Sequence, residues 1–154
     1  MGGIIQNAAR VLATVVVVAC SSGFQAVAGE ASCKKEDFES VVETAAASLR
    51  DLNSKNRPEF QEKLRALKDK RKWNHDEFVA NAAPFVRDDK TEVYDKTTND
   101  LLSDISSMGQ QGSGLEAPDC AMLLELRARM KMLVDTQVAK WSYMFGKLNV
   151  ELAK

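Results

Sequence analysis

Residues 118–152 read PDCAMLLELRARMKMLVDTQVAKWSYMFGKLNVEL, and this stretch decides the fold. Its apolar residues recur every three or four positions, which is the period of an amphipathic helix. One apolar stripe, interrupted at Gln137, consists of Leu123, Leu126, Met130, Leu133, Trp141, Met144, Leu148 and Leu152. A second apolar set widens it and consists of Met122, Leu124, Met132, Val138 and Phe145. Because so wide a stripe packs against several neighbours, we expect a helix of about 50 Å as the central post of a bundle.

Shorter helices are predicted around this post. The first is expected at 34–52, with Ser32 as its N-terminal cap, and the second starts at Pro58 and ends within the basic run 68–72. The third is expected from Asn74 or His75 to Val86, and the fourth at 89–108. Loops are expected at 53–57 and 109–114, and Pro84 should kink or shorten the third helix. No segment alternates with period two, as a half-buried strand would. The prediction is an all-α, single-domain helical bundle of about five helices, the last being the longest.

The N-terminus predicts export. Arg10 precedes the apolar run at 11–19, and Ala26-Val27-Ala28 is a small-x-small site, so residues 1–28 are typical of a secretory signal peptide cut after Ala28. The remaining domain, 29–154, would be periplasmic in a Gram-negative envelope. The alternative is a loose lipobox ending at Cys20, whose acylation would tether the protein. We expect membrane association only in that case, because about nine apolar residues are far fewer than the roughly 20 needed to span a bilayer.

Cleavage after Ala28 removes Cys20, and the lipobox alternative acylates it, so either cut leaves two cysteines to pair, Cys33 and Cys120. An even number in an oxidising compartment favours one disulfide, and the alternative is two separate buried thiols. These cysteines precede the first and last expected helices. A bond needs Cα atoms about 4.4–6.8 Å apart, so the two helices would start together and run roughly parallel.

Composition argues against several function classes. The chain has 21 basic and 22 acidic residues, a near-neutral balance that gives no electrostatic support for nucleic-acid binding. Its one histidine, His75, assembles neither a zinc set nor a catalytic triad, so we expect no enzyme, metal or cofactor. Residues 88–95 are acidic but lack the spacing of a calcium loop. The basic run 68–72 could contact lipid headgroups, but a solvated helix end is the favoured interpretation.

The leading functional hypothesis is binding of another envelope protein, as a chaperone, inhibitor or assembly factor does. Candidate contact residues on the last helix are Met130, Trp141, Tyr143, Met144 and Phe145. Methionine-rich and aromatic surfaces suit varied partners, although plain core filling is the commoner role of such residues.

The second hypothesis is a carrier for a lipid or another apolar ligand. It predicts a pocket lined by Phe38, Leu101, Met130 and Trp141.

Overall fold

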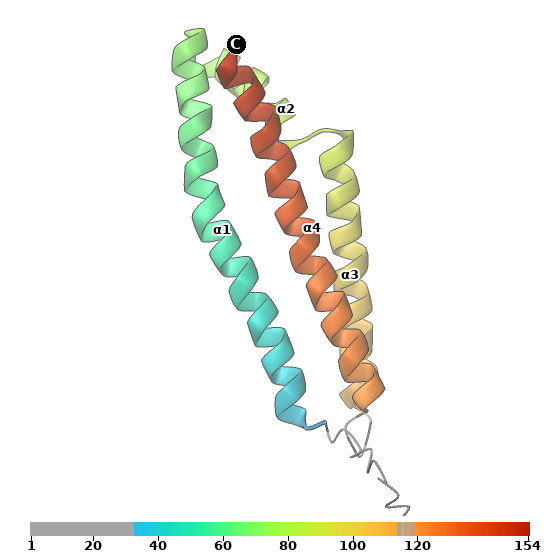
Figure 1. Ribbon diagram of the computed structural model, residues 1–154. Coiled ribbons are helices and arrows are strands. Elements are labelled where there is room, and N and C mark those ends of the chain that lie inside the picture. The colour runs from blue at the N-terminus through green and yellow to red at the C-terminus, as the bar shows by residue number, and fades with distance from the viewer. Residues whose placement is uncertain (1–32, 114, 116, 118) are drawn as a thin grey trace, which may run out of the picture. The chain divides into compact units, whose positions relative to one another are not determined.

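The computed structural model describes residues 33–113, 115, 117 and 119–154, which belong to one compact unit. These residues form α1 (Lys35–Arg71), α2 (His75–Val86), α3 (Asp89–Ser113) and α4 (Cys120–Ala153), with no strand among them (Figure 1). The all-α prediction is therefore confirmed, but the bundle has four helices rather than about five. The expected signal peptide, its cleavage after Ala28, the Ser32 cap and Cys20 lie outside the described residues.

Helix α1 is continuous where a loop was expected at 53–57, and it contains Pro58. Pro58 removes the hydrogen bond to the Ser54 carbonyl, but both residues are exposed, so water can take the missing donor's place. Two residues later, Phe60 is buried against α4, and this packing favours helix on both sides of the proline. The prediction that the last helix is the longest is wrong: among the described helices α1 is the longest, with 37 residues against 34 in α4, because the two helices expected at 34–52 and from Pro58 are continuous. Helix α1 changes direction partway along its length (Figure 1).

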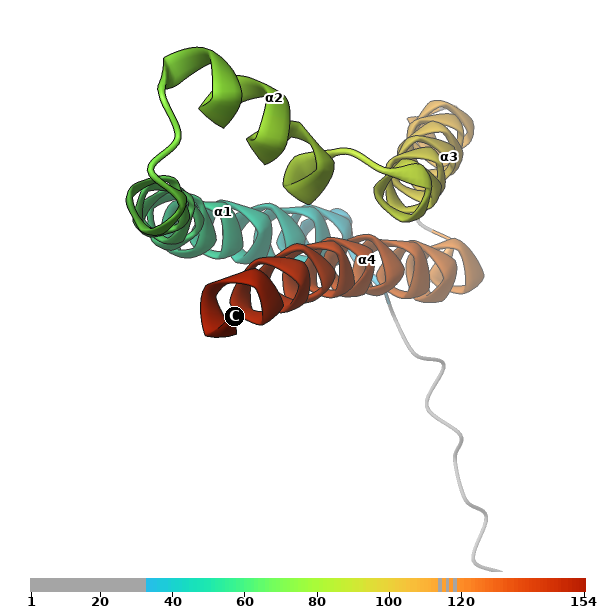
Figure 2. The same ribbon diagram turned by 90° about the horizontal axis from the view of Figure 1, so that it is seen from above.

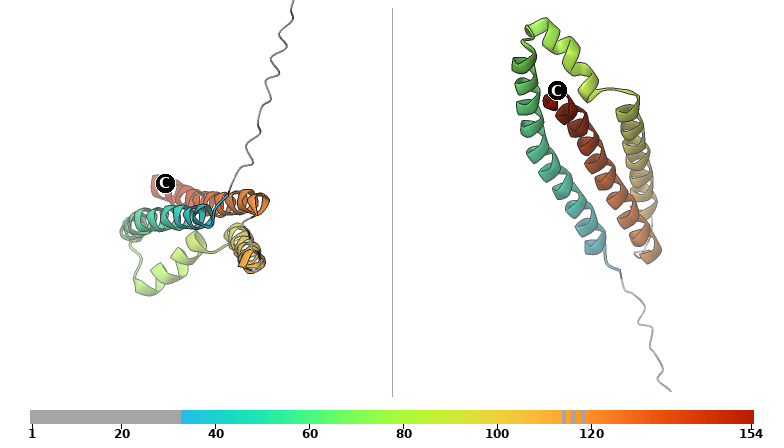
Figure 3. Two further views of the ribbon diagram at one scale, coloured as in Figure 1. Left: turned by 90° about the horizontal axis from the view of Figure 1, so that it is seen from below. Right: turned by 45° about the horizontal axis from the view of Figure 1, so that its top comes forward.

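Helix α4 is the central post, as predicted. It packs against all three other helices, whereas α1 and α3 pack on α4 rather than extensively on each other. Helices α1 and α4 start at the same end and run parallel, and α3 returns in the opposite direction (Figure 3). Seen from above, α2 lies across from α4, between the ends of α1 and α3 (Figure 2).

Two apolar clusters form the core along α4. The disulfide-end cluster consists of the buried residues Ala45, Leu101, Leu126, Met130 and Leu133. The far-end cluster consists of Phe60, Leu67, Met144 and Leu148. Gln137 lies between them in sequence, and its Nε2 donates a hydrogen bond of 2.7 Å to the Thr98 hydroxyl. The polar interruption in the apolar stripe is thus paired across the α3–α4 contact.

The predicted disulfide is present. Cys33 and Cys120 are bonded with a Cα–Cα distance of 5.3 Å, across 87 residues of sequence. The bond joins the starts of α1 and α4, as the parallel arrangement requires. The side chain of Asp119 caps α4 by accepting a 2.8 Å hydrogen bond from the Ala121 backbone N–H.

Helix α3 extends beyond the predicted end at Met108, through Gly109 and Gly112 to Ser113. Glycine costs a helix about 1 kcal/mol relative to alanine, so propensity alone favours a loop here. Tertiary packing outweighs this propensity: a Cβ added at Gly112 would lie only 3.1 Å from the Met122 sulfur, which shows how closely α3 approaches α4.

Helix α2 agrees with prediction at its start, where the Asn74 side chain accepts a hydrogen bond from the Glu77 N–H. It ends at Val86, two residues after Pro84.

Candidate functional site

The candidate contact residues on α4 do not form one surface. Met130 and Met144 are buried, and they belong to different apolar clusters. Trp141 and Phe145 are half-buried, and both rings pack edge-on against Phe60, with centroid distances of 5.9 and 5.3 Å. This aromatic group joins α1 to α4 at the far end. Partner binding by these residues stays a prediction, since burial alone does not test it.

Tyr143 lies in a polar contact between α4 and the start of α3. Its hydroxyl donates to Asp88 Oδ2 at 2.8 Å, and Lys147 Nζ donates to the same oxygen at 2.5 Å. The Lys147 hydrogen bond, assisted by the Thr91 backbone N–H, holds the pKa of Asp88 well below its usual value. The hydrogen bond to Asp88 raises the pKa of Tyr143. The Lys90 ammonium also lies over the Tyr143 ring, 4.5 Å from the ring centroid, in a cation–π contact.

A groove of about 960 Å³ opens at the disulfide end, between α1 and α3 and over the first half of α4. Its lining residues are Lys35, Phe38, Glu39, Val42, Glu43, Ile105, Met108, Gly109, Gly112, Leu115, Ala117, Asp119, Met122, Leu126 and Met130. The floor is apolar and comes from α4, while α1 and α3 supply the two walls. A fourth long helix would pack here in a regular four-helix bundle. The short α2 lies near the C-terminal end of α4, away from this end of the molecule (Figure 1).

The rim of the groove is acidic. Lys35, Glu39 and Glu43 line it from α1, and Asp119 lines it from the start of α4. Lys35 forms an exposed ion pair of 3.9 Å with Glu39, and Glu43 pairs with Arg50 at 2.6 Å. Exposed pairs of this kind are weak and can be exchanged for another partner at little cost.

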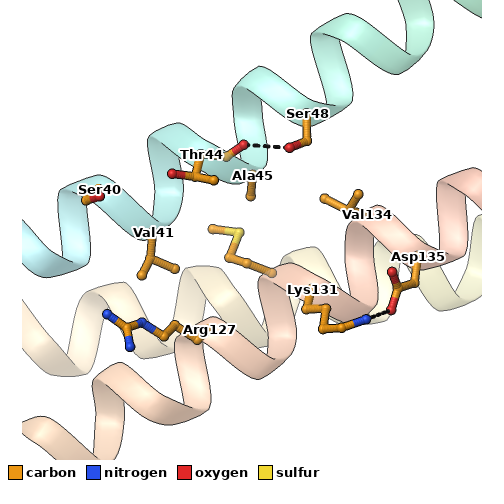
Figure 4. A pocket seen from close by; sticks show the side chains of 10 residues that line it. Ser40, Val41, Thr44, Ala45, Ser48, Arg127, Lys131, Val134 and Asp135 are labelled. Carbon is orange, nitrogen blue, oxygen red and sulfur yellow. Dashed lines mark hydrogen bonds and ion pairs between the residues drawn. The ribbon is translucent and has the colours of Figure 1, made fainter.

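A smaller hollow of about 460 Å³ lies between α1 and α4 (Figure 4). Its rim is polar, and part of it is internally paired: the Ser48 hydroxyl donates to the Thr44 carbonyl at 2.9 Å, and Lys131 pairs with Asp135. The floor includes Ala45 and Val134. Because the rim of this hollow is polar, an apolar ligand would bury less apolar surface here than in the groove.

The pocket expected for a carrier is present only in part. Phe38 and Met130 line the groove, but Leu101 is buried beneath it in the disulfide-end cluster. Trp141 packs in the far-end cluster instead. Three methionines on two helices, Met108, Met122 and Met130, also line the groove, and only the packing of the bundle brings them together.

His75 is exposed at the first position of α2. Within the described residues, no group of three or more His, Cys, Asp or Glu side chains is placed to hold a metal ion. Among the helices of this part of the chain, none combines the length and apolar character that a membrane crossing requires.

Comparisons with family models, curated proteins and solved structures find no match for this chain.

Proposed function

We propose that this protein is a non-catalytic binding protein of the cell envelope, which holds an amphipathic helix of another protein in the groove. The supporting observation is the groove itself. Its lining is mainly apolar, with Met122 half-buried and Val42 exposed, and it lies where a fourth helix of a bundle would pack. A helix laid apolar face down in such a groove is a recurrent mode of recognition.

The dimensions of the groove suit a short helix. Its apolar floor runs from Met122 to Met130, about 12 Å at 1.5 Å per residue, which matches about two helical turns. A matching helix would carry apolar residues at i, i+3 or i+4, and i+7. Met108 and Met122 are half-buried in the groove, and their flexible thioethers adapt to side chains of different shape.

The acidic rim favours a partner helix with basic flanks. Glu39, Glu43 and Asp119 outnumber Lys35 around the opening, and complementary charge speeds association and sets orientation. Export supports an envelope partner, as the expected signal peptide and the disulfide are both typical of exported proteins. Chaperones, inhibitors and assembly factors all work by such binding.

Site-specific photo-crosslinking in the native envelope tests the proposal. A photoreactive residue replaces Val42, which is 42% exposed on the groove wall, and a control replaces Val93, which is 63% exposed on α3 outside the groove. We expect the Val42 probe to crosslink one protein at a peptide with the helical apolar spacing. That peptide, once synthesised, should bind the wild type and bind the Val42→Asp variant about tenfold or more weakly, with Val93→Asp unchanged.

Other crosslinking results would contradict the proposal. These are equal crosslinking from Val93, or products at Val42 containing a second copy of the chain, residues 1–32 of the same chain, or lipid.

A second candidate function is a carrier of an apolar small molecule. A volume of about 960 Å³ lies within the range of ligand sites, roughly 300–1,000 Å³. Native mass spectrometry of the protein from its own envelope fraction separates the two functions. A small apolar mass that is lost in Val42→Asp would favour the carrier, and a protein in fixed ratio would favour the partner helix.

A further inference from the structure

Basic residues gather at the end of the molecule opposite the disulfide. The chain as a whole has a net charge of −1, but residues 63–87 contain seven basic and three acidic residues. The basic ones are Lys63, Arg65, Lys68, Lys70, Arg71, Lys72 and Arg87. This segment covers the last turns of α1 and the whole of α2.

Three of these residues share one face of α1, beside α2. Arg65, Lys68 and Lys72 follow the spacing i, i+3 and i+7, which places them on one side of a helix. The exposed Asp69, at i+4, lies on the same side, so this face has three basic residues and one acidic residue. Lys68 Nζ lies 5.6 Å from the ring centroid of Phe78, so this face adjoins α2. Arg65 and Lys72 are exposed, and neither forms an ion pair with another described residue.

The neighbouring basic residues Lys70 and Arg71 contact α4 instead. Lys70 Nζ donates to the Leu152 carbonyl at 2.6 Å, and Arg71 pairs with Glu151 at 3.0 Å. The basic face formed by Arg65, Lys68 and Lys72 is therefore separate from the contacts that close this end of the bundle.

Helix α2 exposes apolar side chains next to this basic face. None of its residues is buried, and it carries no charge between Glu77 and Arg87. Val79 is 58% exposed and Val86 is 44% exposed, and with Ala83 they follow the spacing i, i+4 and i+7. This 12-residue helix contains Asp76 and Glu77 and no Lys or Arg, so it supplies the apolar stripe while α1 supplies the basic residues. Together the two helices offer the two features of interfacial binding, an exposed apolar stripe and basic side chains.

We propose that this end binds the surface of an anionic lipid bilayer, with α2 lying in the headgroup region. Phosphate groups would pair with Arg65 and Lys72, and the Val79–Val86 stripe would enter the upper acyl region. Basic residues near an anionic surface attract it, and a short apolar stripe adds affinity without spanning. The site is independent of the groove, which lies at the other end of α4.

Vesicle co-sedimentation tests the proposal. The purified protein is mixed with phosphatidylcholine vesicles, with or without phosphatidylglycerol, at low and high salt. We expect binding only to the phosphatidylglycerol vesicles, weakening as salt rises. Arg65→Gln and Lys72→Gln should each weaken binding about fivefold. Val79→Ser should weaken it several-fold, because the stripe loses apolar area.

Matched controls have the same composition change at other sites. Lys55→Gln and Arg57→Gln, made singly, each remove one positive charge from an exposed position of the same helix, and Val93→Ser removes an exposed valine from α3. Helicity and the unfolding midpoint establish that each variant is folded. Three results would overturn the proposal: no vesicle binding, equal losses in the controls, or heparin binding as tight as vesicle binding with Val79→Ser unchanged.

Discussion

Asp88 illustrates how one residue organises the contact between α3 and α4. Its Oδ1 accepts the Thr91 N–H at 2.8 Å and so caps α3, while its Oδ2 accepts from Tyr143 and Lys147. The Thr91 side chain is buried and donates back to the Asp88 carbonyl at 2.8 Å. In the sequence, Asp88 is recognisable only as part of an acidic stretch. Its structural role depends on Tyr143 and Lys147, which follow it by 55 and 59 positions.

The first prediction concerns the charge of Asp88. Since Lys147 holds its pKa below the ordinary value, the ionised carboxylate stabilises the fold above the unfolded-state pKa of about 4, and this contribution is lost as the pH falls through the lower folded-state pKa. Asp88→Asn keeps a capping acceptor but removes the charge. We expect a lower unfolding midpoint at neutral pH and a difference from wild type that shrinks below about pH 4.

Thermal unfolding followed over a pH series measures this difference. Asp100→Asn is the control, because Asp100 pairs with Lys96 on the exposed face of α3. A difference for Asp88→Asn that stays constant into acid would show that its carboxylate charge is not the source.

The second prediction concerns Leu148, which is 0% exposed in the far-end cluster. Leu148→Ala removes apolar surface and leaves a cavity, so it should lower the free energy of unfolding by about 2–5 kcal/mol. Val150, 59% exposed on the same helix, is the control, and Val150→Ala should change stability by less than about 0.5 kcal/mol. Denaturant unfolding measures both, and equal effects would mean that Leu148 is not in the core.

At the scale of elements, packing overrides local preference at two places. Helix α1 passes through Pro58 because apolar residues on both sides of it contact α4, and α3 continues through Gly109 and Gly112 because its end lies close to Met122. Local signals predict breaks at both places. Where they agree with packing, as at the Asn74 cap of α2, the predicted boundary is correct.

The third prediction concerns the end of α3. A Cβ at Gly109 would meet no atom within 4 Å, so Gly109→Ala should stabilise the helix by about 1 kcal/mol and slow amide exchange at 109–113. Gly146 of α4 is equally open and is the matched control, with a similar gain but no effect on α3 exchange. Hydrogen exchange with mass spectrometry distinguishes the two. Unchanged exchange at 109–113 in Gly109→Ala would mean that this segment is not helical in solution.

At the scale of the whole molecule, the disulfide and α4 define the topology. Three helices are arranged around one post, α1 and α3 stand apart at the disulfide end, and the groove lies between them. Helix α1, which forms one wall of the groove, makes few buried contacts at this end. Ala45 is the residue that it contributes to the buried disulfide-end cluster, and Phe38 and Val41 are only partly buried. The bond between Cys33 and Cys120 therefore carries much of the constraint on this wall.

The fourth prediction follows from that constraint. Replacing both cysteines, Cys33→Ser with Cys120→Ser, should lower the free energy of unfolding by about 4 kcal/mol, because the bond closes a loop of 87 residues. Amide exchange should accelerate in the first turns of α1 and stay slow around Leu148. Denaturant unfolding and hydrogen exchange measure the two effects. Uniform acceleration along α1 would contradict the local role of the bond.

The sequence by itself determined the helical class, the central role of α4, the start of α2 and the pairing of Cys33 with Cys120. These features depend on hydrophobic periodicity, helix-start residues and the number of cysteines. Each of these can be read from a short segment of the sequence or from its composition. Tertiary structure alone decided that α1 is one helix, that α3 reaches Ser113, and which apolar residues remain open to solvent. The groove has the same origin: Phe38, Met108 and Met122 lie on three helices, and whether they meet a fourth helix or water depends on packing between elements distant in sequence.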